Sequence, residues 1–348
     1  MATDRIITPH ERTPEEEAQS RALRPESFGE YIGQPDLIER LRIGVEAARE
    51  RGEPMEHVLL HGPPGLGKTT LAHVVANEMG TKARITSGPV LAKGTDLAAA
   101  LMGLEQGDIL FIDEIHRMPI AVEEFIYPAM EDYRIDVTLD SGVNAQTVQI
   151  RCKPFTLIGA TTRAGLLSAP LRSRFGMAHH LKYYSEDELF AIVSRSARLL
   201  GMEGADLEAL RTVAARSRGT PRIANRLLRR VRDFAQVRRS GVVDRETVDA
   251  ALALEGIDRL GLDELDRQYL GVIGRTYGGG PVGLTTVAAT MNEDPGTLED
   301  VVEPFLLQIG FLARTSRGRM LTQAAADHLA LRLRVPGTLP DGDGALFE

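Results

Sequence analysis

A glycine-rich segment at residues 62–69 combines the residue types that bind the phosphates of a nucleotide. The segment, GPPGLGKT, follows an apolar run and precedes a stretch with helical periodicity, which is the context that a phosphate-binding loop requires. Lys68 would neutralise charge on the β- and γ-phosphates, and the Thr69 hydroxyl would ligate Mg²⁺ at the start of the helix. The segment therefore predicts ATP binding with Mg²⁺, against the alternative of an ordinary glycine-rich turn.

Two acids at the end of a second apolar run could supply a hydrolytic centre. The run ILFI at 109–112 ends in Asp113 and Glu114, and parallel strands present their carboxyl ends at the same edge of a sheet. Asp113 would hold Mg²⁺, and Glu114 would orient and deprotonate the attacking water. The alternative is a strand that simply ends in solvated acids, which is less favoured beside a phosphate-binding loop.

Further polar residues follow a third apolar run at 155–160. Thr161, directly after it, is the candidate sensor of the γ-phosphate, and a threonine bonded only to backbone is the alternative. Downstream, Arg172 and Arg174 lie on one short segment, and arginine stabilises the charge that develops on a transferred phosphoryl group. Arg222 opens a later helical stretch, from which it could reach a nucleotide bound by the first domain.

Three kinds of hydrophobic pattern position these residues. Between His57 and Ile158, short apolar runs alternate with amphipathic stretches, which indicates an α/β domain with a buried parallel sheet. Within it, apolar and polar residues alternate over 135–150 around a Ser141-Gly142 turn, which predicts a β-hairpin. From a capping box at Ser185 onward, the apolar spacing is helical only. A small all-helical domain is therefore expected after the α/β domain.

The C-terminal third predicts a winged-helix module. Helical stretches at 265–277, 284–291 and 297–309 precede the segment FLARTSRGRMLT, whose basic residues would lie at the tip of a hairpin. The whole chain is thus expected to hold a flexible arm (1–22), an α/β ATPase domain (23–184), a helical lid (185–256), a winged-helix head (257–335) and a flexible tail (336–348).

Composition narrows the function further. The net charge of -8 argues against indiscriminate coating of nucleic acid, so any DNA contact would be focal. Aromatic residues make up 5% and tryptophan is missing, which favours the duplex backbone over stacked single-stranded bases. No apolar run is long enough to span a bilayer, no signal peptide is evident, and Cys152 has no partner for a disulfide. A cytoplasmic enzyme without membrane contact is expected.

The motifs occur in the order typical of AAA+ ATPases: phosphate loop, LFIDE, GATTR, SRFG and GTPR. Longer strings are similar to the RuvB family of Holliday junction branch migration motors. They include LRPESFGEYIGQ (23–34), LFIDEIHR (110–117), YPAMEDY (127–133) and GTPRIANRLLRRVRDFA (219–235). The resemblance extends from about Leu23 to Leu331, so it covers nearly all of the chain.

This resemblance implies an α/β P-loop NTPase of the AAA+ class with a helical lid and a winged-helix domain. It makes Arg174 an arginine finger that acts on ATP bound to the neighbouring subunit of a hexameric ring, beside the catalytic candidates Glu114, Lys68 and Thr161. The residues that it assigns to nucleotide binding are Leu23, Arg24, Tyr31, Ile32, Gly65, Leu66, Gly67, Lys68, Thr69, Thr70, Glu131, Asp132, Tyr133, Tyr184 and Arg222.

The resemblance also implies macromolecular partners. The hairpin at 135–150 would dock onto RuvA, and the RuvC resolvase is a further candidate partner. Arg314 and Arg319 would touch duplex DNA at Holliday junctions. The implied function is an ATP-driven motor of homologous recombination and DNA repair within the SOS response.

Other functions would use parts of the same sequence. The string DEIH is also found in DExH helicases, but that class has two α/β motor domains, and the second domain here is predicted to be helical. A protein-remodelling machine would carry an aromatic-glycine pore loop, which residues 86–107 do not offer. A loader without turnover would lack Lys68, Asp113, Glu114 or Arg174. Another AAA+ DNA motor or loader remains the alternative to branch migration.

Overall fold

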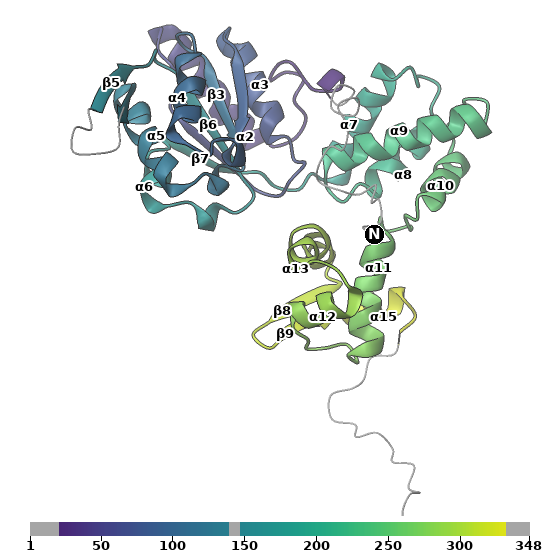
Figure 1. The fold of residues 1–348 in the computed structure, drawn as a ribbon. Coiled ribbons are helices and arrows are strands. Elements are labelled where there is room, and N and C mark those ends of the chain that lie inside the picture. Colours follow the sequence, from purple (N-terminus) through teal and green to yellow (C-terminus); the bar gives the residue numbers. More distant parts are fainter. Residues whose placement is uncertain (1–20, 139–146, 332–348) are drawn as a thin grey trace, which may run out of the picture.

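Three bodies follow one another along the chain in the computed structural model, which describes residues 21–138 and 147–331. An α/β domain and a helical lid lie side by side, and a head lies below the lid in the view of Figure 1. The α/β domain and the lid share one continuous hydrophobic cluster, whereas the head has a cluster of its own. The predicted arm up to residue 20, the hairpin tip at Ser141-Gly142 and the tail from residue 332 lie outside the described residues.

A parallel sheet forms the centre of the α/β domain, with the strand order β2-β3-β6-β1-β7. Successive strand residues face opposite sides, so Phe111 joins one hydrophobic cluster and its neighbours Leu110 and Ile112 join the other. Both faces are therefore covered, which confirms the predicted buried sheet. The strands are β1 (Val58–His61), β2 (Ala83–Ser87), β3 (Ile109–Asp113), β6 (Thr156–Thr161) and β7 (Met177–His180).

Helices cover the two faces of this sheet. Residues of the first two helices pack in the same cluster as Phe111, and residues of the next three pack in the cluster on the other face. These helices are α2 (Pro35–Arg51) and α3 (Lys68–Met79), then α4 (Gly94–Met102), α5 (Ile120–Asp132) and α6 (Ala169–Ser173). Single helical turns connect them at η1 (Gly88–Val90), η2 (Ile115–Arg117) and η3 (Ala164–Leu166).

A separate antiparallel ribbon extends from the α/β domain. Its strands are β4 (Arg134–Thr138) and β5 (Thr147–Arg151), and the backbone register pairs Ile135 with Ile150. This pairing agrees with the hairpin predicted for residues 135–150. In Figure 1 the ribbon lies at the end of the α/β domain that is remote from the lid.

The lid consists of α7 (Glu186–Leu199), α8 (Leu207–Ala215), α9 (Pro221–Arg238) and α10 (Arg245–Leu254). Its first helix begins at the predicted capping box. The Glu188 backbone N donates to Ser185 Oγ at 3.2 Å, and the Ser185 backbone N donates to Glu188 Oε2 at 2.8 Å. These two bonds satisfy N–H groups that the first turn leaves without helical partners.

The head is a winged-helix domain, as predicted. Its helical elements are α11 (Glu264–Gly271), η4 (Val272–Thr276), α12 (Leu284–Met291), α13 (Pro295–Thr297), η5 (Leu298–Val302), α14 (Glu303–Gln308) and α15 (Gln323–His328). Its hairpin pairs β8 (Leu312–Thr315) with β9 (Gly318–Leu321), and Arg314 lies opposite Arg319. Helix α15 had no counterpart among the predicted elements. None of the helices in the described part of the chain is long and apolar enough for a bilayer crossing.

Candidate functional site

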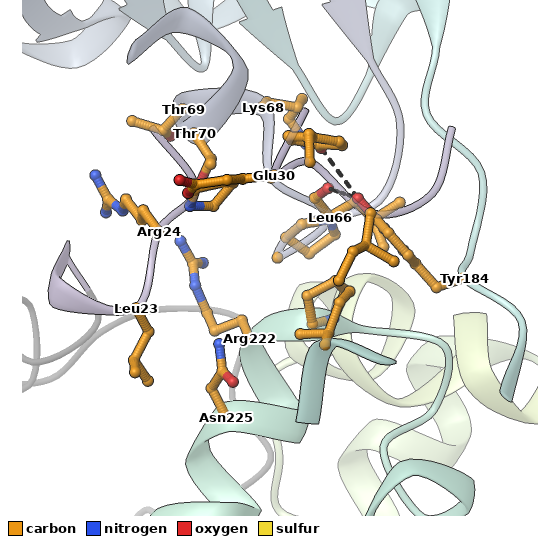
Figure 2. Close-up of a pocket in the computed structure, with 18 of the residues that line it drawn as sticks. Leu23, Arg24, Glu30, Leu66, Lys68, Thr69, Thr70, Tyr184, Arg222 and Asn225 are labelled. Carbon is orange, nitrogen blue, oxygen red and sulfur yellow. Dashed lines mark hydrogen bonds between the residues drawn. The ribbon is translucent and has the colours of Figure 1, made fainter. Parts of the chain in front are cut away.

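A pocket between the α/β domain and the lid gathers most of the predicted nucleotide-binding residues (Figure 2). Figure 2 shows Arg222 and Asn225 of the lid facing the side that carries Lys68, Thr69 and Thr70. The lining residues come from the segment before α2 (Leu23, Arg24, Pro25, Glu30, Tyr31, Ile32), the phosphate loop and α3 (Pro64, Gly65, Leu66, Gly67, Lys68, Thr69, Thr70), the end of β3 (Asp113, Glu114) and the lid side (Tyr184, Ile192, Arg195, Pro221, Arg222, Asn225).

The loop that carries Lys68 can be closed only by glycines. Gly65 has φ +80° and Gly67 has φ +99°, and residues other than glycine rarely adopt these backbone angles. A Cβ atom at Gly65 would lie 2.8 Å from Thr220 Cγ2, and one at Gly67 would lie 2.8 Å from Tyr31 Oη. The loop therefore packs directly against both the lid and the segment that precedes α2.

Lys68, at the start of α3, is nearly buried at 7% exposure. Its Nζ donates to the carbonyl oxygens of Gly62 at 2.8 Å and Pro63 at 2.9 Å. Burial lowers the pKa of Lys68 to about 8, although the carboxylates of Asp113 and Glu114 act in the opposite direction. The ammonium group is thus held at the phosphate loop with its charged form partly destabilised.

This shift predicts how nucleotide affinity depends on pH. Bound phosphates favour the charged form of Lys68. Above a pH of about 8 the free protein holds Lys68 mostly uncharged, so Lys68 must take up a proton when the nucleotide binds. We expect the affinity for ADP to fall by up to about tenfold for each further pH unit, because the uncharged amine dominates there. Fluorescence anisotropy with labelled ADP in EDTA measures this dependence. Lys68→Arg, which stays protonated in that range, is the control, and an equal slope in both proteins would contradict the prediction.

The two acids at the end of β3 lie in different environments. Asp113 Oδ1 accepts a hydrogen bond from the Glu114 backbone N at 3.0 Å, and burial, then the charge of Glu114, raises the pKa of Asp113. Glu114 has φ +45°, an uncommon conformation for a residue other than glycine that is often retained at functional sites. Its Oε2 accepts from Thr162 Oγ1 at 3.1 Å and lies 3.1 Å from His116 Nδ1. Glu114 is thus oriented by two neighbours.

Thr161, the candidate phosphate sensor, and its neighbour Thr162 contact different residues. Thr161 is 0% exposed and does not line the pocket, because its hydroxyl lies 2.9 Å from His116 Nδ1 and accepts from the Arg163 backbone N at 3.0 Å. Thr162 instead donates to Glu114. Thr162, which follows β6, is therefore in contact with Glu114, whereas Thr161, the last residue of β6, contacts His116. The assignment of Thr161 as the phosphate sensor stays a prediction.

Tyr184 connects three parts of the pocket. Its hydroxyl lies 3.0 Å from Tyr31 Oη and donates to the Leu66 carbonyl oxygen at 3.2 Å. Its backbone N donates to the Gly219 carbonyl oxygen at 2.9 Å, which joins the residue to the turn before Arg222. Burial raises the pKa of Tyr184 to about 12, so the phenol remains a neutral hydrogen-bonding group.

Sequence reasoning missed several lid residues of the pocket, and Arg195 is the clearest case. Its Nη1 donates to the Leu23 carbonyl oxygen at 2.9 Å, and its Nη2 donates to Glu30 Oε2 at 3.0 Å. Arg195 thereby holds the segment before α2 against the lid. No motif marks Arg195, which lies at an ordinary polar position of an amphipathic helix. Asn225 lies within the string 219–235, but its polar position alone gave no reason to single it out.

Besides Thr161, four residues predicted for the nucleotide site lie outside the pocket lining: Arg174, Glu131, Asp132 and Tyr133. They belong to α5, α6 or the residues just after these helices, which pack on the sheet face opposite α3. Tyr133 packs edge-on against Phe155, and Asp132 lies 3.4 Å from Arg134.

Arg174 and Glu131 form a group of their own. Arg174 Nε lies 3.1 Å from Glu131 Oε1, and Arg174 Nη1 donates to the Pro170 carbonyl oxygen at 2.9 Å. The guanidinium carbon lies 4.3 Å from the centroid of the Tyr127 ring. Arg174 is therefore held in place, but it does not contact the pocket of its own chain.

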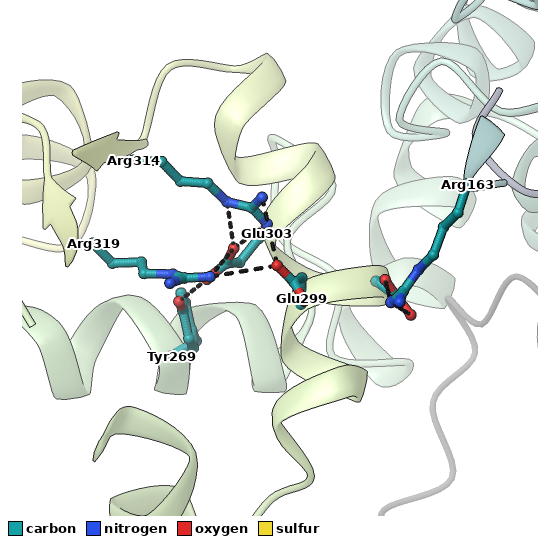
Figure 3. Close-up of polar contacts among 7 residues, drawn as sticks. Arg163, Tyr269, Glu299, Glu303, Arg314 and Arg319 are labelled. Atoms are coloured by element: carbon teal, nitrogen blue, oxygen red, sulfur yellow. Dashed lines mark hydrogen bonds and ion pairs between the residues drawn. The ribbon is translucent and has the colours of Figure 1, made fainter. Parts of the chain in front are cut away.

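The two predicted DNA-contacting arginines flank a buried acid (Figure 3). Arg314 Nε donates to Glu303 Oε2 at 2.7 Å, and Arg319 Nε donates to Glu303 Oε1 at 2.9 Å. Tyr269 Oη also donates to Glu303 Oε1 at 2.5 Å. Burial opposes ionisation, but these hydrogen bonds outweigh it and hold the pKa of Glu303 below its usual value. The Arg314 side chain is 42% exposed and that of Arg319 only 18%, so Arg314 is the more accessible to a partner.

A phosphate loop after β1 and an acidic pair at the end of β3, with β6 between these two strands and a helical lid over the pocket, define a P-loop ATPase. Family models match residues 23–181 (Holliday junction DNA helicase RuvB P-loop domain), 184–258 (RuvB AAA lid domain) and 259–330 (RuvB C-terminal winged helix domain). The chain belongs to the RuvB family.

Individual relatives agree with this assignment. The chain is 55% identical over 328 residues to the Holliday junction branch migration complex subunit RuvB of Desulfosudis oleivorans, which covers 94% of this chain and 95% of the relative. It resembles the structure of the Thermotoga maritima RuvB Holliday junction branch migration motor with a TM-score of 0.81 and 49% identity, over 90% of this chain and 100% of the other. A mutant of the Thermotoga protein gives a TM-score of 0.82 at 50% identity, over 90% and 99% of the two chains.

Proposed function

We propose that this chain is the ATP-hydrolysing motor subunit of a Holliday junction branch migration complex. The observation that carries the proposal is a single pocket in which Lys68, Asp113 and Glu114 face Arg222 of the lid, in a chain that also has a winged-helix head. The family assignment agrees with this function. The motor would act in the cytoplasm, in homologous recombination and DNA repair within the SOS response.

The chemistry follows from the positions of the pocket residues. Glu114 would take a proton from a water molecule, whose oxygen bonds to the γ-phosphorus while the bond to the β–γ bridging oxygen breaks. Lys68 and Arg222 would neutralise charge on the phosphates, and Thr162 would keep Glu114 aligned. ADP and phosphate would then leave as products.

Mg²⁺ would be held by the Thr69 hydroxyl and Asp113, which line the pocket together. Two protein ligands suffice, because Mg²⁺ bound with nucleotides takes its other ligands from phosphates and water. When bound, it withdraws charge from the phosphate oxygens. Burial and the charge of Glu114 raise the pKa of Asp113, and a bound cation would offset both effects by stabilising the carboxylate.

The site requires a second copy of the chain if Arg174 is catalytic. Arg174 and Glu131 lie together outside the pocket of their own chain, so we assign them, with Asp132 and Tyr133, to the nucleotide of a neighbouring subunit. When each subunit contacts the next through two different surfaces in this way, the subunits form a ring if the rotation between them closes. We propose a homohexamer around duplex DNA.

The other partners would contact opposite ends of the subunit. The β4–β5 ribbon lies far from the lid in Figure 1, and we propose it as the surface for RuvA, with RuvC as a further partner in the complex. Arg314 and Arg319 would contact DNA phosphates from the head. Arg317, at the exposed turn between β8 and β9, is placed to join them.

A labelled four-way junction tests the proposed function. With ATP and RuvA, we expect the wild-type chain to exchange strands and Lys68→Ala to lose this activity almost completely, because the phosphates lose their cation. Electrophoretic separation of the products measures the rate. Lys82→Ala, which removes an exposed lysine outside the pocket, should behave as the wild type. ATP hydrolysis without any movement of the junction would contradict the proposal.

A further inference from the structure

A charged contact joins the α/β domain directly to the head. Arg163 Nη2 donates to both carboxylate oxygens of Asp300. Figure 3 shows Arg163 on its right side, with its side chain directed toward the head. The two side chains are 43% and 52% exposed. Ion pairs of this exposure contribute little to the stability of a fold, so this contact can form and break with small changes in domain position.

On the α/β side, Arg163 is attached to the residues that hold the catalytic carboxylate. It directly follows Thr162, whose hydroxyl donates to Glu114. Its backbone N donates to Thr161 Oγ1, and that oxygen lies 2.9 Å from His116 Nδ1. His116 is itself 3.1 Å from Glu114. A displacement of Glu114 would therefore shift Thr162 and His116, and through them the backbone of Arg163.

On the head side, Asp300 lies in η5 between two acids that bind the hairpin arginines. Glu299 Oε1 lies 3.7 Å from both Arg314 Nη1 and Arg319 Nη2. Glu303 pairs with both arginines at closer range. The segment 299–303 thus contacts the α/β domain through Asp300. Through Glu299 and Glu303 it pairs with both arginines of the hairpin, as Figure 3 shows.

The head is attached to the lid much more firmly than to the α/β domain. Arg218 of the lid pairs with Asp266 of the head, and the two side chains are 3% and 0% exposed. Arg218 Nε also donates to the Gly261 carbonyl oxygen at 2.7 Å, and its guanidinium carbon lies 4.6 Å from the Phe305 ring centroid. Breaking a buried pair leaves an uncompensated charge. The head should therefore follow the lid, so Arg163–Asp300 is a contact between the α/β domain and the head that should change.

We propose that Arg163 and Asp300 are positioning residues that couple the state of the nucleotide to the DNA-contacting hairpin. While the pair is intact, Arg163 holds Asp300, and the adjacent Glu299 stays beside Arg314 and Arg319. When the lid turns and carries the head away from the α/β domain, the pair breaks. The exposed side chains of Glu299 and Asp300 are then free to shift relative to the hairpin, while Glu303 stays buried in the head. This inference rests on the proposed function, because it assumes that the chain hydrolyses ATP and binds duplex DNA.

The test compares the duplex-DNA affinity of the full-length protein with ADP and with a non-hydrolysable ATP analogue. Coupled sites typically alter one another's affinity by about fivefold or more, so we expect a ratio of at least about fivefold for the wild type. For Asp300→Asn we expect a ratio below about twofold, with DNA-free ATP hydrolysis unchanged. Glu293→Gln, which neutralises another acid of the head, is the matched control and should keep the wild-type ratio.

A charge exchange separates coupling from simple loss of a side chain. Arg163→Asp and Asp300→Arg should each abolish the nucleotide dependence of DNA affinity, and the double variant should recover it, because the exposed pair can re-form in reverse. A double variant no better than the single ones would overturn the inference. The inference would also be overturned if Asp300→Asn kept the wild-type ratio of DNA affinities, or if the DNA affinity of the wild type were the same with both nucleotides. If the wild type neither hydrolyses ATP nor binds DNA, the proposed function itself fails.

Discussion

Glu114→Gln should bind ATP as the wild type does and hydrolyse it about 10²–10⁴ times more slowly, the range that a positioned general base contributes. The amide has the shape of the carboxylate, and its oxygen can still accept the hydrogen bond from Thr162. It cannot take a proton from water. Single-turnover hydrolysis together with an equilibrium measurement of ATP affinity separates the lost step from binding.

The matched control for this variant is Glu50→Gln, which neutralises an exposed carboxylate on α2 outside the pocket. It should hydrolyse ATP at the wild-type rate. Normal turnover in Glu114→Gln would remove this carboxylate from the mechanism. A loss of ATP affinity as large as the loss of rate would show that Glu114 supports the pocket and not the reaction.

Arg174→Ala should reduce ATP hydrolysis by about 10³–10⁵, the range measured for arginine fingers. Because Arg174 lies outside the pocket of its own chain, mixing this variant with Lys68→Ala should restore part of the activity. In an equal mixture, about one interface in four (one half times one half) joins an intact pocket to an intact finger in a head-to-tail ring. Phosphate release measured against the mixing ratio should therefore pass through a maximum.

Two controls make the mixing experiment specific. Lys68→Ala mixed with the double variant Lys68→Ala/Arg174→Ala has no intact pocket and should stay inactive at every ratio. Arg172→Ala removes a neighbouring arginine that donates to the Ala164 carbonyl oxygen of its own chain, and it should retain most of the activity. A monotonic curve without a maximum would place the whole reaction within one subunit.

Features encoded in short contiguous segments could be predicted from the sequence. The phosphate loop and the acidic end of β3 are local patterns, and the apolar runs around them indicate a buried parallel sheet without knowledge of any distant contact. The winged-helix head could be predicted for the same reason, since its helical stretches and hairpin follow in order. Helix α15 (Gln323–His328) was missed because its six residues are too short for periodicity to show.

Features that depend on long-range geometry could not be predicted. The sequence does not distinguish Thr161 from Thr162, because both are threonines after the same apolar run. Only the backbone conformation at the end of β6 decides which hydroxyl reaches Glu114. Arg195 became a pocket residue through contacts with a segment 165 positions away. From the sequence, Glu303 would be predicted to be a solvated helix residue. In the structure it is fully buried and pairs with both hairpin arginines.

The division of hydrophobic packing has a consequence for how the protein loses its structure. One cluster runs without interruption from the sheet into the lid, whereas the head packs around a cluster of its own. Regions that share a core unfold cooperatively, and regions with separate cores can open independently. Heat should therefore melt this protein in two stages, and ATP should delay only the stage that includes the sheet and the lid, since a ligand stabilises the unit whose folded form binds it.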